Sequence, residues 1–162
     1  MLLKIKNILL IITAISLFSC SAEYSDLNVI GDENPVTGIW TDTTHLETQG
    51  KIISTLTFTD NGSFTYSADK YGIYSNQSDS DLSAYSRDIG NYVLSVKNIY
   101  FASKQNTTWD SSTGGDPVTT SEEQTLFDEC SYTINEDTLT LNYITYSANA
   151  QASTTKLFTR VH

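Results

Sequence analysis

The chain of 162 residues is long enough for one domain and carries 19 acidic against 9 basic side chains, a net charge of −10 at pH 7. Such an acidic surface repels nucleic-acid phosphates and anionic lipid headgroups. The composition therefore excludes a nucleic-acid-binding protein and a domain that lies flat on an anionic membrane.

The first twenty residues have the parts of a bacterial export signal. Lys4 and Lys6 supply positive charge, and residues 8–17 form a nearly continuous apolar run, which is too short for a spanning helix of about 20 residues. Residues 17–20, Leu-Phe-Ser-Cys, resemble the lipobox of bacterial lipoproteins. We predict a lipoprotein signal peptide over residues 1–19 and membrane anchoring by lipid on Cys20. The alternative is an ordinary signal peptide with an incidental cysteine.

The mature chain is expected to be a tether followed by an all-β domain. Residues 20–35 are polar and acidic and contain Gly31 and Pro35, which is typical of a flexible tether. Residues 36–162 are rich in Thr, Tyr, Ile, Val and Phe, in short runs without helical periodicity. Eight strands are predicted, at residues 36–44, 52–59, 63–68, 89–95, 99–103, 122–134, 138–146 and 154–161.

The connections between these strands alternate in length. Tight turns are expected at residues 60–62, 96–98 and 135–137, and longer connections at residues 45–51, 69–88, 104–121 and 147–153. In an up-and-down meander, successive connections alternate between the two ends. The pattern therefore predicts an antiparallel up-and-down eight-stranded barrel with one closed base and one mouth formed by long loops.

Several short motifs resemble a known family. Gly38-Ile39-Trp40 is similar to the Gly-x-Trp signature of the lipocalin and wider calycin group, and residues 56–64, 89–92, 137–141 and 156–160 follow in the order seen in lipocalin-like domains of Bacteroidota lipoproteins. The resemblance spans residues 36–161 and implies a lipocalin-like β-barrel on the outer membrane or cell surface of a Gram-negative bacterium. The Thr-Asp-Tyr motif of lipocalins is missing, so no specific ligand is carried over.

The resemblance also implies a pair that closes the base of the barrel. In the family an early Trp packs against an Arg of the last strand, and the matching residues are Trp40 and Arg160. The meander independently makes the first and last strands neighbours near the tight turns. We expect the Arg160 guanidinium within about 6 Å of the Trp40 ring, in a stabilising role.

The long connections supply the candidate ligand-binding residues. Trp109 lies in one of them, and Tyr71, Tyr74 and Tyr85 lie in another, among amide and hydroxyl side chains. Aromatic faces with a few directed hydrogen bonds suit sugars and apolar small molecules. The alternative is that Trp109 folds back over the mouth and the tyrosines pack on strands.

Catalytic and metal chemistry have weak support. His45 stands near Asp42 and Glu47, and Asp79 and Asp81 offer oxygen ligands without the spacing of an EF-hand loop. Solvated loops explain both groups better. We predict no enzyme, no cofactor and no metal site.

Cys130 has no partner within the chain once Cys20 carries lipid. It lies on the same strand face as Leu126, Tyr132 and Ile134, which favours a buried thiol over a reactive one.

Three functions remain open at this stage. The leading hypothesis is a membrane-anchored module that binds a small apolar or saccharide-like ligand at the open end of the barrel. The alternative is a structural or protein-interaction lipoprotein with a filled barrel. An enzyme would need a titratable pair inside a cavity. Interior volume discriminates the first two, because ligand pockets occupy about 300–1,000 Å³.

Replacement of Cys20 tests the anchor. Two or more acyl chains hold a protein stably on a membrane, each buried methylene contributing about 0.8 kcal/mol. The Cys20→Ala variant should be released or accumulate as uncleaved precursor, measured by detergent-phase partitioning and mass spectrometry. Partitioning identical to that of the parent would show that Cys20 is not the anchor.

Overall fold

The computed structural model describes residues 34–47, 49–147 and 150–162 and is all-β. The predicted signal peptide, Cys20 and residues 20–33 of the predicted tether lie outside the described residues. No helix in the described part is long and apolar enough to cross a membrane. The elements are β1 (Gly38–His45), β2 (Lys51–Phe58), β3 (Ser63–Tyr71), β4 (Leu82–Leu94), β5 (Ile99–Asp110), the short 3-10 helix η1 (Ser111–Thr113), β6 (Val118–Thr120), β7 (Gln124–Thr125), β8 (Asp128–Asn135), β9 (Thr138–Ser147) and β10 (Ala150–Val161).

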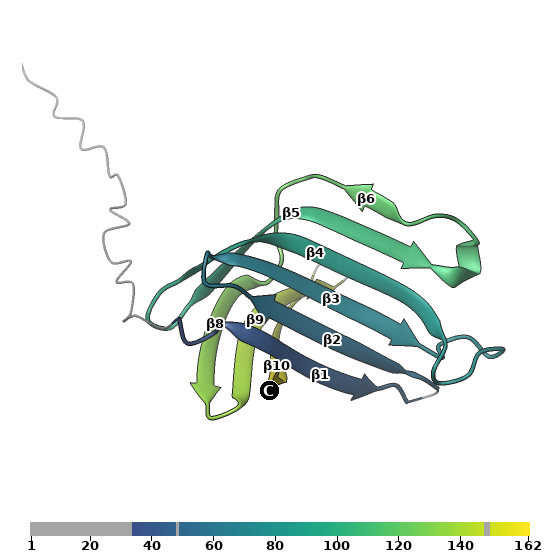
Figure 1. Cartoon of the computed structure of the whole chain (residues 1–162), viewed down its shortest axis with the longest axis horizontal. Helices are drawn as coiled ribbons and strands as arrows, with labels where there is room; N and C mark the ends of the chain where they lie inside the picture. The colour runs from purple at the N-terminus through teal and green to yellow at the C-terminus, as the bar shows by residue number, and fades with distance from the viewer. Residues whose placement is uncertain (1–33, 48, 148–149) are drawn as a thin grey trace, which may run out of the picture.

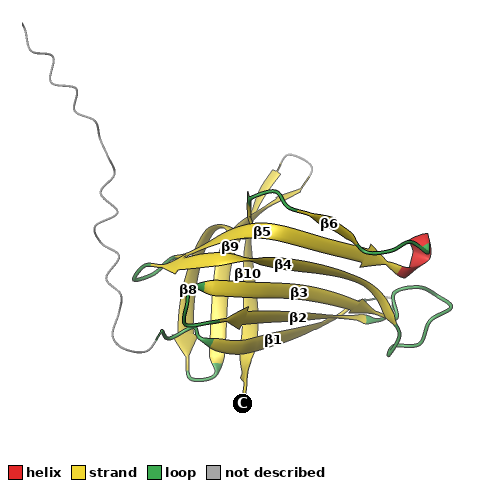
Figure 2. Cartoon of the chain, turned by 45° about the horizontal axis from the view of Figure 1, so that its top comes forward, coloured by secondary structure: helices red, strands yellow, loops and turns green. Residues whose placement is uncertain are grey.

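The strands form one curled antiparallel sheet. Its order is β6-β5-β4-β3-β2-β1-β10-β9-β8, with β7 paired to β5. The first and last long strands are neighbours, since β1 pairs with β10 in a register that sets Trp40 opposite Arg160. Figures 1 and 2 show β8, β9 and β10 running steeply across the direction of β1–β5, so the sheet wraps around an interior.

The two edges of the sheet meet at one end only. Asn98, in the β4–β5 turn, forms a bridge with Ser131 of β8, and the Tyr132 amide donates to the Lys97 carbonyl at 3.0 Å. Toward the other end, β5 pairs with β6 and β7 instead of β8. The protein is therefore closed at the turn end and open at the other.

The strand count is a correction to the sequence prediction. The described part of the chain contains ten strands, because residues 118–120 and 124–125 form β6 and β7 along β5. The outer edge of β5 would otherwise carry unpaired backbone groups, and the returning chain satisfies them. The finding is an all-β antiparallel sheet curled into a partly closed barrel.

Three of the predicted long loops are largely strand. β4 begins at Leu82, β5 ends at Asp110 and β10 begins at Ala150, so the strands extend well into residues 69–88, 104–121 and 147–153. These extensions are mostly polar, with only scattered apolar residues such as Leu82 and Trp109, and so lack the regular apolar alternation that identifies a strand in sequence. The remaining long connections, residues 72–81 and 111–117, lie at the open end (Figure 1).

The core lies at the closed end, next to the tight turns. Phe58 and Phe64 flank the β2–β3 turn, and Ile99 and Phe101 follow the β4–β5 turn. Gly90 lets the sheet pack closely here, because a Cβ at this position would lie 2.0 Å from the Ala102 carbonyl oxygen. The buried cluster is Val36, Trp40, Leu56, Phe58, Phe64, Tyr92, Ile99, Phe101, Phe127, Cys130, Leu139, Leu141 and Phe158.

Trp40 and Arg160 meet at the base of this core. The Arg160 guanidinium carbon lies 4.1 Å from the centroid of the Trp40 ring, and Trp40 is fully buried. Arg160 also donates to the carbonyls of Thr37, at 2.8 Å, and Pro35, at 3.1 Å. The Trp40 indole donates to the Val36 carbonyl at 2.7 Å. One side chain thus joins the last strand to the segment that precedes the first.

Arg160→Lys should destabilise the fold by about 1–2 kcal/mol, because an ammonium cannot reproduce the planar stack together with two directed hydrogen bonds. Arg87→Lys is the matched control, since Arg87 is exposed and lies 5.5 Å from the Tyr85 ring on β4. Urea unfolding measures both. An equal loss of unfolding free energy in the two variants would show that the contact between Arg160 and Trp40 stabilises the fold no more than an exposed cation–aromatic contact does.

Candidate functional site

The concave face of the sheet changes from apolar to polar above the core. Asp42 follows Trp40 by two positions on β1, and Lys156 precedes Phe158 by two on β10. Ser54 precedes Leu56 by two on β2. Side chains two apart on a strand share a face, so these three point into the same interior as the core. We call Asp42, Ser54 and Lys156 the interior polar cluster.

The cluster is a hydrogen-bonded ion pair on three neighbouring strands. The Lys156 Nζ lies 2.7 Å from the Ser54 Oγ and 3.4 Å from the Asp42 Oδ2. Its side chain is 19% exposed, and that of Asp42 is 23% exposed. The Lys156 Nζ also lies 5.5 Å from the centroid of the Phe158 ring. Two opposite charges therefore stand at the upper surface of the apolar core with part of each still open to water.

A serine beside a lysine is also the minimal pairing of a nucleophile with a base. Ser54, however, is fully buried. Its hydroxyl therefore faces the protein and has no path to a substrate. The geometry suits recognition better than covalent chemistry.

A second polar pair occupies the wall formed by β4 and β5. Asp88 is 3% exposed and accepts a hydrogen bond of 2.9 Å from the Ser103 hydroxyl, which is itself fully buried. Asp88 pairs with Tyr66 across the β3–β4 ladder, so it too lies on the face of the core. The interior above the core thus holds polar side chains on both walls, with Asp88 and Ser103 buried.

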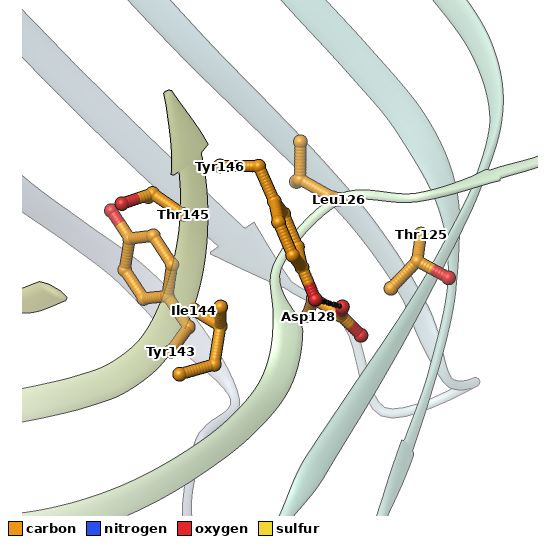
Figure 3. A pocket seen from close by; sticks show the side chains of 7 residues that line it. All are labelled: Thr125, Leu126, Asp128, Tyr143, Ile144, Thr145 and Tyr146. Carbon is orange, nitrogen blue, oxygen red and sulfur yellow. Dashed lines mark hydrogen bonds between the residues drawn. The ribbon is translucent and has the colours of Figure 1, made fainter. Parts of the chain in front are cut away.

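A groove of about 450 Å³ opens beside β9 (Figure 3). The β8–β9 ladder begins with Asp128 opposite Ile144, because the preceding residues turn away to pair with β5 as β7. The groove occupies the space that this divergence leaves. It is lined by Thr125, Leu126, Asp128, Tyr143, Ile144, Thr145 and Tyr146.

The groove combines aromatic surface with hydrogen-bonding groups. Figure 3 shows Tyr146 directed at Asp128, and its hydroxyl donates to the carboxylate at 2.8 Å. Tyr143 and Thr145 lie on the opposite side of β9 from Ile144 and Tyr146. The groove therefore reaches both faces of the strand.

Tyr143 connects the groove to the interior. Its ring centroid lies 4.7 Å from that of Phe127 in the core. Burial raises the pKa of the Tyr143 hydroxyl, and the neighbouring Tyr66, Cys130 and Asp42 groups raise it further. Asp42 of the interior polar cluster therefore acts electrostatically on Tyr143.

Two of the four aromatic residues predicted from the sequence lie together at the rim. Tyr85 and Trp109 are stacked with ring centroids 5.9 Å apart, and both line a hollow of about 340 Å³. Lys70, Asp110 and Asp116 line the same hollow. The Trp109 indole donates to the Gly115 carbonyl at 3.1 Å, which ties the ring to the segment after η1.

The other two predicted residues have different positions. The Tyr74 hydroxyl donates to the Asp110 carboxylate at 2.7 Å, and this bond and those from Ser112 lower the pKa of Asp110. Tyr71 lies beneath Lys51, whose Nζ is 5.8 Å from the ring centroid. Tyr74 therefore borders the hollow through Asp110, whereas Tyr71 is not among the lining residues.

Sequence reasoning missed both the groove and the interior polar cluster. The cluster had a signal: each of its members stands two residues from a core position on the same strand. No sequence pattern indicated the groove, because the groove forms where β7 pairs with β5 and β8 pairs with β9.

The residues considered for metal binding show no shared site. His45 is exposed at the end of β1. The Asp81 carboxylate accepts from the Ser78 amide at 2.8 Å, which shapes the turn between β3 and β4. Within residues 34–47, 49–147 and 150–162, no three His, Cys, Asp or Glu side chains are grouped to hold a metal ion.

Searches against protein-family models, curated proteins and solved structures find no match for this chain.

Cys130 gives a direct test of the core. It is buried, and burial raises the pKa of its thiol to about 12. In the Cys20→Ala variant, where Cys130 is the only cysteine, alkylation at pH 8 should be about 100-fold or more slower in the folded protein than in urea, because the thiolate is the nucleophile. Equal rates with and without urea would contradict the packing of β8.

Proposed function

We propose that the chain is a membrane-anchored lipoprotein whose lipocalin-like barrel binds a small molecule at its open end. In this proposal lipid on Cys20 holds the domain on the outer membrane or cell surface of a Gram-negative bacterium. The eight long strands are the barrel, and β6 and β7 are additions to it. No cofactor or catalytic step is invoked.

The observation that carries the proposal is the groove of about 450 Å³ beside β9. This volume lies within the range of about 300–1,000 Å³ that is usual for ligand pockets. Tyr143, Tyr146 and Leu126 offer ring and aliphatic surface, and Thr145 and Asp128 offer directed polar groups. A few polar groups around apolar surface are the usual composition of a small-molecule site.

The position of the N-terminal segment supports the orientation. Asn34 donates to the Tyr92 hydroxyl, and the Pro35 carbonyl accepts from Arg160, so the chain joins the barrel at its closed base. A lipid anchor upstream of residue 34 would then direct the open end away from the membrane. The ligand would be captured from the aqueous side.

The alternative remains a structural or protein-interaction lipoprotein. The filled lower half of the barrel and the apolar side chains on its outer surface favour it, including Leu157, 58% exposed. In that case the groove would be solvent-filled and of no consequence.

Co-purification distinguishes these functions. We expect native mass spectrometry of the protein from its membrane to show a retained small molecule, and Tyr146→Ala to reduce its occupancy about tenfold, because the variant removes a wall of the groove and its bond to Asp128. Tyr100→Ala is the matched control, since Tyr100 is 51% exposed on β5 and Tyr146 is 58% exposed on β9.

Occupancy that falls equally in both variants would locate the molecule elsewhere. A protein that carries no small molecule in any preparation would contradict the proposed function and favour the structural alternative.

A further inference from the structure

We propose that the ligand is a neutral saccharide or similar polyhydroxylated molecule, recognised by the interior polar cluster of Asp42, Ser54 and Lys156. This inference rests on the proposed function and narrows it, because an apolar ligand was the other class considered. It adds a recognition site beside the groove, on β1, β2 and β10.

The cluster has donor and acceptor capacity left over. An ammonium offers three donors; Lys156 donates one hydrogen bond to Ser54 and forms an ion pair with Asp42 at 3.4 Å. On Asp42, the Oδ2 atom faces Lys156 and accepts from Thr44 at 3.1 Å, whereas within the described part of the chain the Oδ1 atom has no hydrogen-bond partner. A donor and an acceptor thus stand side by side on neighbouring strands.

This arrangement matches two adjacent hydroxyl groups. One hydroxyl can accept from the Lys156 ammonium while its neighbour donates to the Asp42 carboxylate. Hydrogen bonds to charged groups are among the stronger ones in proteins, and here the charges are already oriented by Ser54. Because the pair is neutral as a whole, it gives no net attraction to an acidic or a basic ligand.

An apolar ligand fits this surface poorly. The side chains of Lys156 and Asp42 keep 19% and 23% of their surface exposed. A hydrocarbon chain placed over them would remove the remaining water from both charges without replacing its hydrogen bonds, which is unfavourable.

The groove supplies an aromatic surface next to the cluster. Tyr143 lines the groove and points to the side of β9 that Thr145 shares. Thr145 in turn shares a hydrogen bond of 2.9 Å with Thr154, two residues from Lys156 on β10. In the β9–β10 register Tyr143 lies opposite Thr154 and Leu141 opposite Lys156, so Tyr143 and Lys156 are near neighbours on the same face. A sugar ring can pack its C–H face on Tyr143 and direct its hydroxyls inward.

Binding should be measured on the full mature protein with two probes. The first is an array of immobilised neutral and acidic mono- to tetrasaccharides, and the second is a fluorescent fatty acid in solution. We expect neutral saccharides to bind at least as well as their acidic counterparts, and the fatty acid not to bind. The best saccharide is then titrated by calorimetry.

Lys156→Met removes the donors while keeping the length of the side chain, and Asp42→Asn keeps the shape while removing the charge. Each should weaken saccharide binding about tenfold or more. Lys51→Met is the matched control, because Lys51 lies on β2 with its Nζ over Tyr71, outside the cluster. The saccharide affinity of this variant should equal that of the parent. Thermal unfolding checks each variant, and Asp42→Asn carries the test if Lys156→Met does not fold.

The outcomes separate this inference from the proposed function. Saccharide binding that is indifferent to Lys156 and Asp42, acidic saccharides preferred through Lys156, or binding of the fatty acid alone would overturn the saccharide assignment and leave a ligand-binding barrel. Binding of neither probe would also overturn it, and together with an empty protein by native mass spectrometry would end the proposed function too.

Discussion

The pairing of the first and last long strands is the constraint on which the rest of the structure depends. More than a hundred residues separate Trp40 from Arg160, and joining them converts a meander into a curled sheet with an inside. The stack of the guanidinium on the indole sets the register, and the register sets Thr41 opposite Thr159. Asp42 then stands within reach of Lys156. The contact at the base therefore also determines the polar pair above it.

The interior is divided into two halves with different roles. The lower half is packed with aromatic and aliphatic side chains and supplies the hydrophobic stabilisation of a domain of this size. The upper half holds Asp42, Lys156, Asp88 and Ser103, so its burial contributes little to folding. Burial of apolar side chains consequently favours contact between the two edges of the sheet only at the base. Above the base, the chain between β5 and β8 follows β5, and the groove beside β9 remains.

Much of the fold was predictable from local signals, and the site was largely not. The all-β class and the three tight turns follow from alternation and from turn residues such as Asp60-Asn61-Gly62, where Gly62 has a φ of +80°. The strand extensions of β4 and β5 were missed, since their residues are mostly polar and show no regular apolar alternation. Tyr85 and Trp109 were identified as mouth aromatics without any sign that they stack on each other. The groove depends on where β7 pairs, a long-range choice that no local pattern encodes. The interior polar cluster combines three strands distant in sequence, although each strand carried its part of the pattern.

The short strand β6 at one edge of the sheet affects how readily copies of the protein associate at high concentration. β6 is three residues long and pairs β5 through Asn106, Thr107 and Thr108 only. An incoming strand from a neighbouring copy would find so short a template that it could gain few backbone hydrogen bonds before reaching the turn on either side. This edge of the sheet is thereby protected against growth by edge-to-edge addition. Strand addition between copies at high density is therefore disfavoured along β5 and β6.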